Sequence, residues 1–187
     1  CAQELSDAHV DVMGYACLVA IMSMGRGYHC VSEVNLHQET VANDFPTPIV
    51  TSAGALINGL KVLGAKQISI ITPYMRPLTD MVVDYIENQG IKVKQSIALE
   101  IPDNLEVAAQ NPLNLLEIYK QLDLTDVDVL VASACVQMPS LEAIDLIQAE
   151  CGIPVTSAAV CTTYEMMKKL NIEPKSAIGG ELLSGKY

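Results

Sequence analysis

The stretch VDVLVASACVQMPSLEAIDLIQAECG (residues 127–152) decides the fold of this chain. Its first half is a run of small and β-branched apolar residues that stops at Cys135, which predicts a strand buried on both faces. Its second half has apolar residues at helical spacing and stops at Gly152, a residue type that commonly terminates helices. A buried strand that leads into a helix is the repeating unit of a parallel sheet.

The same alternation of strand-like and helix-like segments continues along the rest of the chain. Further strands are expected over residues 10–17, 47–52, 67–74, 91–99 and 153–157. Further helices are expected over residues 30–44, 53–64, 77–90, 112–122 and 158–171. This pattern predicts an α/β fold in which helices cover both faces of parallel sheets. In such folds the functional site lies beyond the C-terminal ends of the strands.

The composition limits the compartment and the partners. Half of the 187 residues are hydrophobic, which is enough for a sizeable core. The formal net charge is −11 and the only arginines are Arg26 and Arg76, which disfavours nucleic acid as a partner. The longest apolar run, Tyr15–Met24, is too short to span a membrane. Because no secretory signal is visible, we expect a soluble, cytoplasmic protein with reduced thiols.

The cysteines fall into two groups. No pair has C-x-x-C spacing and the histidines add no zinc pattern, so no metal site is expected. Cys30, Cys151 and Cys161 are expected to be small core residues. Cys17 and Cys135 differ from these because each follows a predicted strand and an alanine. A single cysteine at such a place is more often a core thiol, but two at matching places favour a functional pair from two related halves.

Paired thiols can carry out specific chemistry on a small substrate. A thiolate is a strong nucleophile or a base for carbon-bound protons, and a second thiol can return a proton on the opposite face. No histidine lies beside either cysteine in the sequence to activate it. The pattern therefore disfavours a cysteine–histidine pair of the papain type.

Four segments of the chain resemble a known family. GYACLVA (14–20), TPYMRPLTD (72–80), PDN (102–104) and SACVQMPSLEAI (133–144) are similar to the maleate cis-trans isomerases of the aspartate/glutamate racemase superfamily. The resemblance extends in order across essentially the whole chain. It implies isomerisation of maleate to fumarate, without metal or other cofactor, through a covalent succinyl-cysteine intermediate.

The resemblance also implies roles for individual residues. Cys17 would add to the carbon–carbon double bond, and Cys135 would exchange a proton with the neighbouring carbon. Tyr74 and Asn104 would donate hydrogen bonds to the substrate carboxylates from a hydroxyl and an amide. The resemblance also implies substrate contacts from three apolar residues next to the thiols, Leu18, Val19 and Val136. The backbone around Leu18 and Val19 would supply N–H donors.

The family's architecture gives expectations for the domains. It implies two Rossmann-like lobes related by a pseudo-twofold axis, with residues 1–46 and 160–187 in a partial N-terminal lobe and 47–159 in a C-terminal lobe. Family members have a leading βα unit with a substrate-binding asparagine that this sequence, which opens at Cys1, does not contain. We therefore expect this unit to be absent here, and by analogy we expect a homodimer or a higher homo-oligomer acting on a small dicarboxylate.

Three alternatives remain open. Racemases of the superfamily usually place Asn-Thr and Thr after their two cysteines, where this chain has Leu18-Val19 and Val136, so a racemase or epimerase is disfavoured. Arylmalonate decarboxylases have a similar fold but use one catalytic cysteine, and the presence of both cysteines here disfavours a decarboxylase. A non-enzymatic binding module would keep its ligand affinity after loss of both thiols.

Several residues also have simpler interpretations. Without the resemblance, Tyr74 is a boundary aromatic residue and Asn104 a turn or N-cap residue. Thr51 and Ser52, at a strand–helix junction, are expected to cap a helix rather than to hold a carboxylate. His29 and His37 are expected on the surface of a helix.

Overall fold

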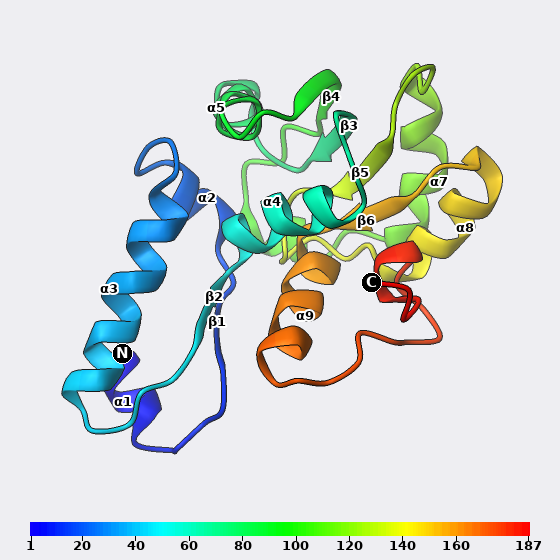
Figure 1. Cartoon of the computed structure of the whole chain (residues 1–187). Helices are drawn as coiled ribbons and strands as arrows, with labels where there is room; N and C mark the ends of the chain where they lie inside the picture. The colour runs from blue at the N-terminus through cyan, green and yellow to red at the C-terminus, as the bar shows by residue number, and fades with distance from the viewer.

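The computed structural model describes residues 1–187, and it contains two parallel sheets (Figure 1). The larger sheet has the strand order β4-β3-β5-β6, formed by Lys92–Ala98, Gln67–Thr72, Val129–Ser133 and Val155–Ser157. The smaller sheet pairs β1 (Met13–Tyr15) with β2 (Ile49–Thr51). The α/β prediction with parallel sheets is confirmed, whereas the pseudo-twofold relation stays a prediction.

The helices lie between and around these strands. They are α1 (Ala2–Ser6), α2 (Leu18–Met22), α3 (Tyr28–Ala42), α4 (Ser52–Val62), α5 (Arg76–Glu87), α6 (Asn104–Ala108), α7 (Leu115–Ile118), α8 (Leu141–Cys151) and α9 (Ala158–Lys169). Three 3₁₀ turns are η1 (Pro112–Asn114), η2 (Tyr119–Gln121) and η3 (Glu181–Leu183). None of the helices is both long enough and apolar enough to span a lipid bilayer.

Every strand predicted from the sequence contains an observed strand, and four of the predicted helices match α3, α4, α5 and α9. The stretch 127–152 forms β5 and α8, with Gly152 in the left-handed conformation (φ 75°) that ends the helix. The helix expected over residues 112–122 is wrong in detail. It winds as η1, α7 and η2, because helical segments this short consist mostly of ends, where 3₁₀ hydrogen bonds are common.

The centre of the core is the pair β3 and β5. Every residue of β5, and every residue of β3 after Gln67, is buried. Burial of consecutive residues requires cover on both faces of the sheet, which explains the unbroken apolar runs in the sequence. The C-terminal ends of these two strands are therefore rigid, and the loops that follow them start from fixed positions.

Elements on the two sides of the lobe boundaries expected from the sequence pack against each other at two places. β2, assigned to the lobe of residues 47–159, pairs with β1, assigned to residues 1–46. α9, which starts at Ala158 and crosses the expected limit at 159/160, packs against α4. The assignment of lobes stays a prediction, but the pairing places β2 in the same sheet as the N-terminal strand.

The contact between α4 and α9 is tight at one glycine. A Cβ atom on Gly59 would lie 2.6 Å from the sulfur of Cys161, a distance that real contacts do not reach. Cys161 is fully buried, as its expected core position requires, and burial raises the pKa of its thiol to about 12. The absence of a side chain at residue 59 thus sets how closely the two helices approach.

Replacing Gly59 by alanine should lower the free energy of unfolding by about 1–3 kcal/mol, because the added methyl group overpacks the α4–α9 contact. The loss should appear although alanine favours a helix interior over glycine by about 1 kcal/mol. Urea unfolding followed by circular dichroism measures it, with Asn58→Ala, an exposed position on the same helix, as the control. A Gly59→Ala variant as stable as the wild type would contradict the packing argument.

Candidate active site

Cys135 lies two residues beyond the end of β5 and is 8% exposed. The hydroxyl of Ser133, the last residue of the strand, donates to the carbonyl oxygen of Cys135 at 2.9 Å and accepts from its backbone N–H at 3.3 Å. Both bonds fix the backbone of Cys135 against the strand end. The thiol is therefore held by the most buried part of the sheet.

Cys17 lies two residues beyond β1, in an extended conformation at the N-cap of α2. Its side chain is exposed, whereas Leu18 is buried and Val19 is half-buried against the core. The first N–H groups of a helix have no acceptor within it, so the N–H groups of Leu18 and Val19 are free to bind an acceptor beside the thiol. The structure thus gives Cys17 access to solvent and neighbouring donors.

Tyr74 follows β3 by two residues and contacts the loop that carries Cys135. Its half-buried hydroxyl donates to the carbonyl oxygen of Ala134 at 3.1 Å. Burial raises the pKa of Tyr74 far above its ordinary value. Smaller contributions come from Cys135, through its charge and a hydrogen bond when it is ionised, and from the charge of Cys17. The hydroxyl consequently stays protonated.

Asn104 is the first residue of α6. The cap of this helix is its neighbour Asp103, whose carboxylate accepts from the N–H groups of Leu105 at 2.6 Å and Glu106 at 3.4 Å. The interpretation of Asn104 as an N-cap residue is therefore wrong. Its side chain is exposed and its amide makes no hydrogen bond in the structure, so the amide is available to a ligand.

Three of the expected residues meet at one edge of the larger sheet. Tyr74, Asn104 and Cys135 follow β3, β4 and β5, and the C-terminal ends of parallel strands lie at the same edge. Cys17 comes from the end of the other sheet. Helix α2, which begins right after Cys17, packs against α5, which begins two residues after Tyr74, so this end faces the same region.

Two contacts hold the segment after Cys17 against α5, the helix that begins just after Tyr74. Arg26 makes a two-pronged ion pair with Asp84, its Nε donating at 3.0 Å. The ring of His29 bonds the hydroxyl of Tyr85 at 2.5 Å, and that hydroxyl also accepts the backbone N–H of His29 at 3.1 Å. No local pattern in the sequence predicts these partners, since each pair is far apart in the chain.

The surface placement expected for His29 is wrong because this contact buries it, and burial lowers the pKa of its imidazole. His37 is exposed, as expected. The core placement of Cys30 is also wrong, since that side chain is exposed on α3, and Cys151 is half-buried. Thr51 is the N-cap of α4, accepting from Gly54 N–H at 3.1 Å, which confirms its capping role.

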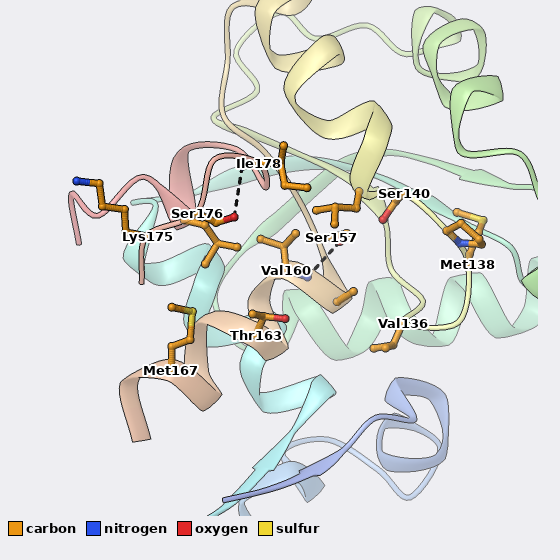
Figure 2. A pocket seen from close by; sticks show the side chains of 14 residues that line it. Val136, Met138, Ser140, Ser157, Val160, Thr163, Met167, Lys175, Ser176 and Ile178 are labelled. Carbon is orange, nitrogen blue, oxygen red and sulfur yellow. Dashed lines mark hydrogen bonds between the residues drawn. The ribbon is translucent and has the colours of Figure 1, made fainter. Parts of the chain in front are cut away.

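The largest of the four main cavities, about 550 Å³, does not enclose either thiol. Of the expected site residues only Val136 lines it, together with residues of α9 and the C-terminal segment (Figure 2). Lys175, at its rim, directs its amine away from the cavity in this view. Neither cysteine lines any of the four main cavities. No group of three or more His, Cys, Asp or Glu side chains is placed to hold a metal ion.

Comparison with known proteins identifies the family. A family model described as arylmalonate decarboxylase matches residues 1–183. A maleate isomerase from Geobacillus stearothermophilus is 55% identical over 187 residues, which cover 100% of this chain and 74% of that protein. The chain belongs to the maleate isomerase family.

Solved structures of the maleate isomerase family share the fold described above. A cysteine-to-alanine variant from Pseudomonas putida, crystallised with maleate, is 58% identical with a TM-score of 0.99, over 100% of this chain and 75% of that one. A cysteine-to-serine mutant from Nocardia farcinica with a covalently bound succinylcysteine intermediate is 38% identical with a TM-score of 0.95, over 100% and 76%. The predicted family is confirmed, and the protein is an isomerase of this family.

The raised pKa of Tyr74 can be tested by spectroscopy. We expect the absorbance of tyrosinate near 295 nm, measured as wild type minus Tyr74→Phe, to show no titration up to about pH 11, because burial and the nearby thiolates oppose a further negative charge. Far-ultraviolet circular dichroism at each pH checks that the protein stays folded. A titration near pH 10 that the Tyr74→Phe variant lacks would show that the hydroxyl is not in this environment.

Proposed function

We propose that the protein converts maleate into fumarate without a cofactor, through a succinyl thioether on Cys17. The observation that carries this proposal is the arrangement of the strand ends. Tyr74, Asn104 and Cys135 follow three parallel strands of one sheet, and α2, which begins right after Cys17, packs against α5, which begins just after Tyr74. Relatives at 55% identity named maleate isomerases support the same substrate, and the Nocardia farcinica structure with succinylcysteine supports the covalent intermediate.

In the first half of the reaction the Cys17 thiolate forms a bond to C2 of maleate. The π electron pair of the double bond moves onto C3 and its adjoining carboxylate. The thiol of Cys135 then gives its proton to C3, which leaves a succinyl group on Cys17 and a thiolate at Cys135. The bond between C2 and C3 is now single and can rotate.

The second half reverses these events after rotation. The Cys135 thiolate removes a proton from C3, the electron pair re-forms the double bond, and the bond between C2 and the sulfur of Cys17 breaks. The product is fumarate, and both cysteines return to their starting states. No atom is oxidised or reduced overall, so the two thiols suffice for the whole cycle.

Neutral donors would hold the two carboxylates. The free amide of Asn104 can donate to a carboxylate oxygen. The Tyr74 hydroxyl, which stays protonated, can donate to another when it releases the carbonyl oxygen of Ala134. The N–H groups of Leu18 and Val19 can do so beside Cys17. Charge that spreads into a carboxylate as the thiolate adds is stabilised by such fixed donors, and this lowers the barrier to addition.

A decarboxylase is the second candidate, because the matching family model is described as arylmalonate decarboxylase. Solved arylmalonate decarboxylases are only 17–18% identical to this chain, a level that supports the fold alone. Two thiols, one after β1 and one after β5, fit addition and proton exchange better than loss of carbon dioxide. The isomerase is therefore the function that the site supports best.

Replacing Cys17 by serine or alanine should lower the rate of fumarate formation by at least about a thousandfold, because the weaker or missing nucleophile cannot form the thioether. Loss of maleate and gain of fumarate are followed by ultraviolet absorbance. Intact-mass analysis during turnover should show an adduct of maleate's mass on the wild type and none on Cys17→Ala.

The matched control for this variant is Cys30→Ala, which removes another exposed thiol, located on α3. It should keep wild-type turnover and the adduct. Normal turnover by Cys17→Ser would rule out the covalent route.

Replacing Cys135 by serine should slow completion of the cycle, because a hydroxyl is a much weaker proton donor and base than a thiol. We expect fumarate formation, followed by ultraviolet absorbance, to fall by at least about a hundredfold, because both protonation and deprotonation of C3 are slowed. A variant that turns over at the wild-type rate would remove Cys135 from the mechanism.

A further inference from the structure

Each of the three loops at the edge of the larger sheet carries one residue of the proposed mechanism. The loop after β3 carries Tyr74, the loop after β4 leads to Asn104, and the loop after β5 carries Cys135. Loops are ordinarily the most mobile parts of a fold, so their relative positions depend on the bonds between them. Hydrogen bonds join these three loops in pairs.

Two of the three pairings involve the loop of Tyr74. Its hydroxyl donates to Ala134 at 3.1 Å, which ties the first loop to the Cys135 loop. The carbonyl oxygens of Pro73 and Tyr74 accept backbone N–H groups of Ile101 at 2.9 Å and Glu100 at 3.2 Å. The loop before Asn104 is therefore tied to the first loop through the main chain.

The third pairing consists of one hydrogen bond. The side-chain amide of Gln137 donates to the backbone carbonyl oxygen of Asn104 at 2.8 Å. No other hydrogen bond joins the loop after β5 to α6 or to the segment before it. Gln137 is exposed, so burial of its side chain does not account for this contact.

We propose that Gln137 is a positioning residue that fixes the Asn104 amide relative to the Cys135 thiol. The inference rests on the proposed function, in which Asn104 holds a carboxylate while Cys135 exchanges a proton with the adjacent carbon. Gln137 stands two residues from the thiol and bonds the carbonyl group of Asn104 itself. Without it, the loop that leads to Asn104 is tied only to the Tyr74 side.

The length of α6 makes this bond more important. With five residues and a single cap at Asp103, the helix has little internal stability of its own. The end that carries Asn104 is the end that Gln137 holds. A displacement of the amide of about 1 Å is enough to lower the rate of an oriented reaction strongly.

The chain offers a matched control for Gln137. The amide of Gln110 likewise donates to a backbone carbonyl oxygen of α6, that of Glu106, at 3.0 Å. That bond lies on the C-terminal side of the helix, away from Asn104, and does not involve the loop after β5. Methionine has nearly the shape of glutamine but lacks the donor, so Gln137→Met and Gln110→Met remove one comparable hydrogen bond each.

The test is a double-mutant cycle for maleate turnover in the full-length protein. We expect Gln137→Met to lower kcat/KM by about three- to tenfold, the usual effect of one lost hydrogen bond. We expect Gln110→Met to leave kcat/KM unchanged, and both variants to keep the melting temperature of the wild type. In an Asn104→Ala background, Gln137→Met should have no further effect, because the group that it positions is gone.

Each result of the cycle has one meaning. An equal loss from Gln137→Met with and without the Asn104 side chain, or no loss at all, would overturn the inference while wild-type isomerisation keeps the proposed function intact. A wild-type protein that does not isomerise maleate would overturn the proposed function, and the role of Gln137 with it.

Discussion

The hydrogen bond from the Tyr74 hydroxyl to the carbonyl oxygen of Ala134 is the interaction on which the rest of the site depends. A half-buried phenol needs an acceptor, and this one lies next to Cys135, so satisfying the phenol also brings the loops after β3 and β5 together. Burial keeps the phenol neutral. Because the phenol has a single proton, it donates to a substrate carboxylate only by giving up its bond to Ala134.

The sheet makes this meeting possible. β3 and β5 are adjacent and parallel, so the loops that follow them leave from the same edge, and β4 places the third loop next to them. Because both central strands are buried on each face, the strand ends cannot shift without opening the core. Ser133 extends that rigidity to the backbone of Cys135.

The second thiol reaches the site from a different sheet, and side chains rather than strands hold it there. Arg26 with Asp84 and His29 with Tyr85 attach the segment after Cys17 to α5. The first pair is exposed and contributes little stability, so the buried pair is the more important one. Since α5 begins at Arg76, these contacts place Cys17 relative to the loop of Tyr74.

The sequence alone determined the order of strands and helices and the two thiols at strand ends, because periodicity, glycine caps and the placement of cysteines are local signals. Its resemblance to a family supplied Tyr74 and Asn104. Only the tertiary structure decided that β2 pairs with β1, that His29 is buried on Tyr85, and that Gln137 bonds Asn104. Such contacts join residues 33 or more positions apart, and no local pattern records which distant partner a side chain will meet.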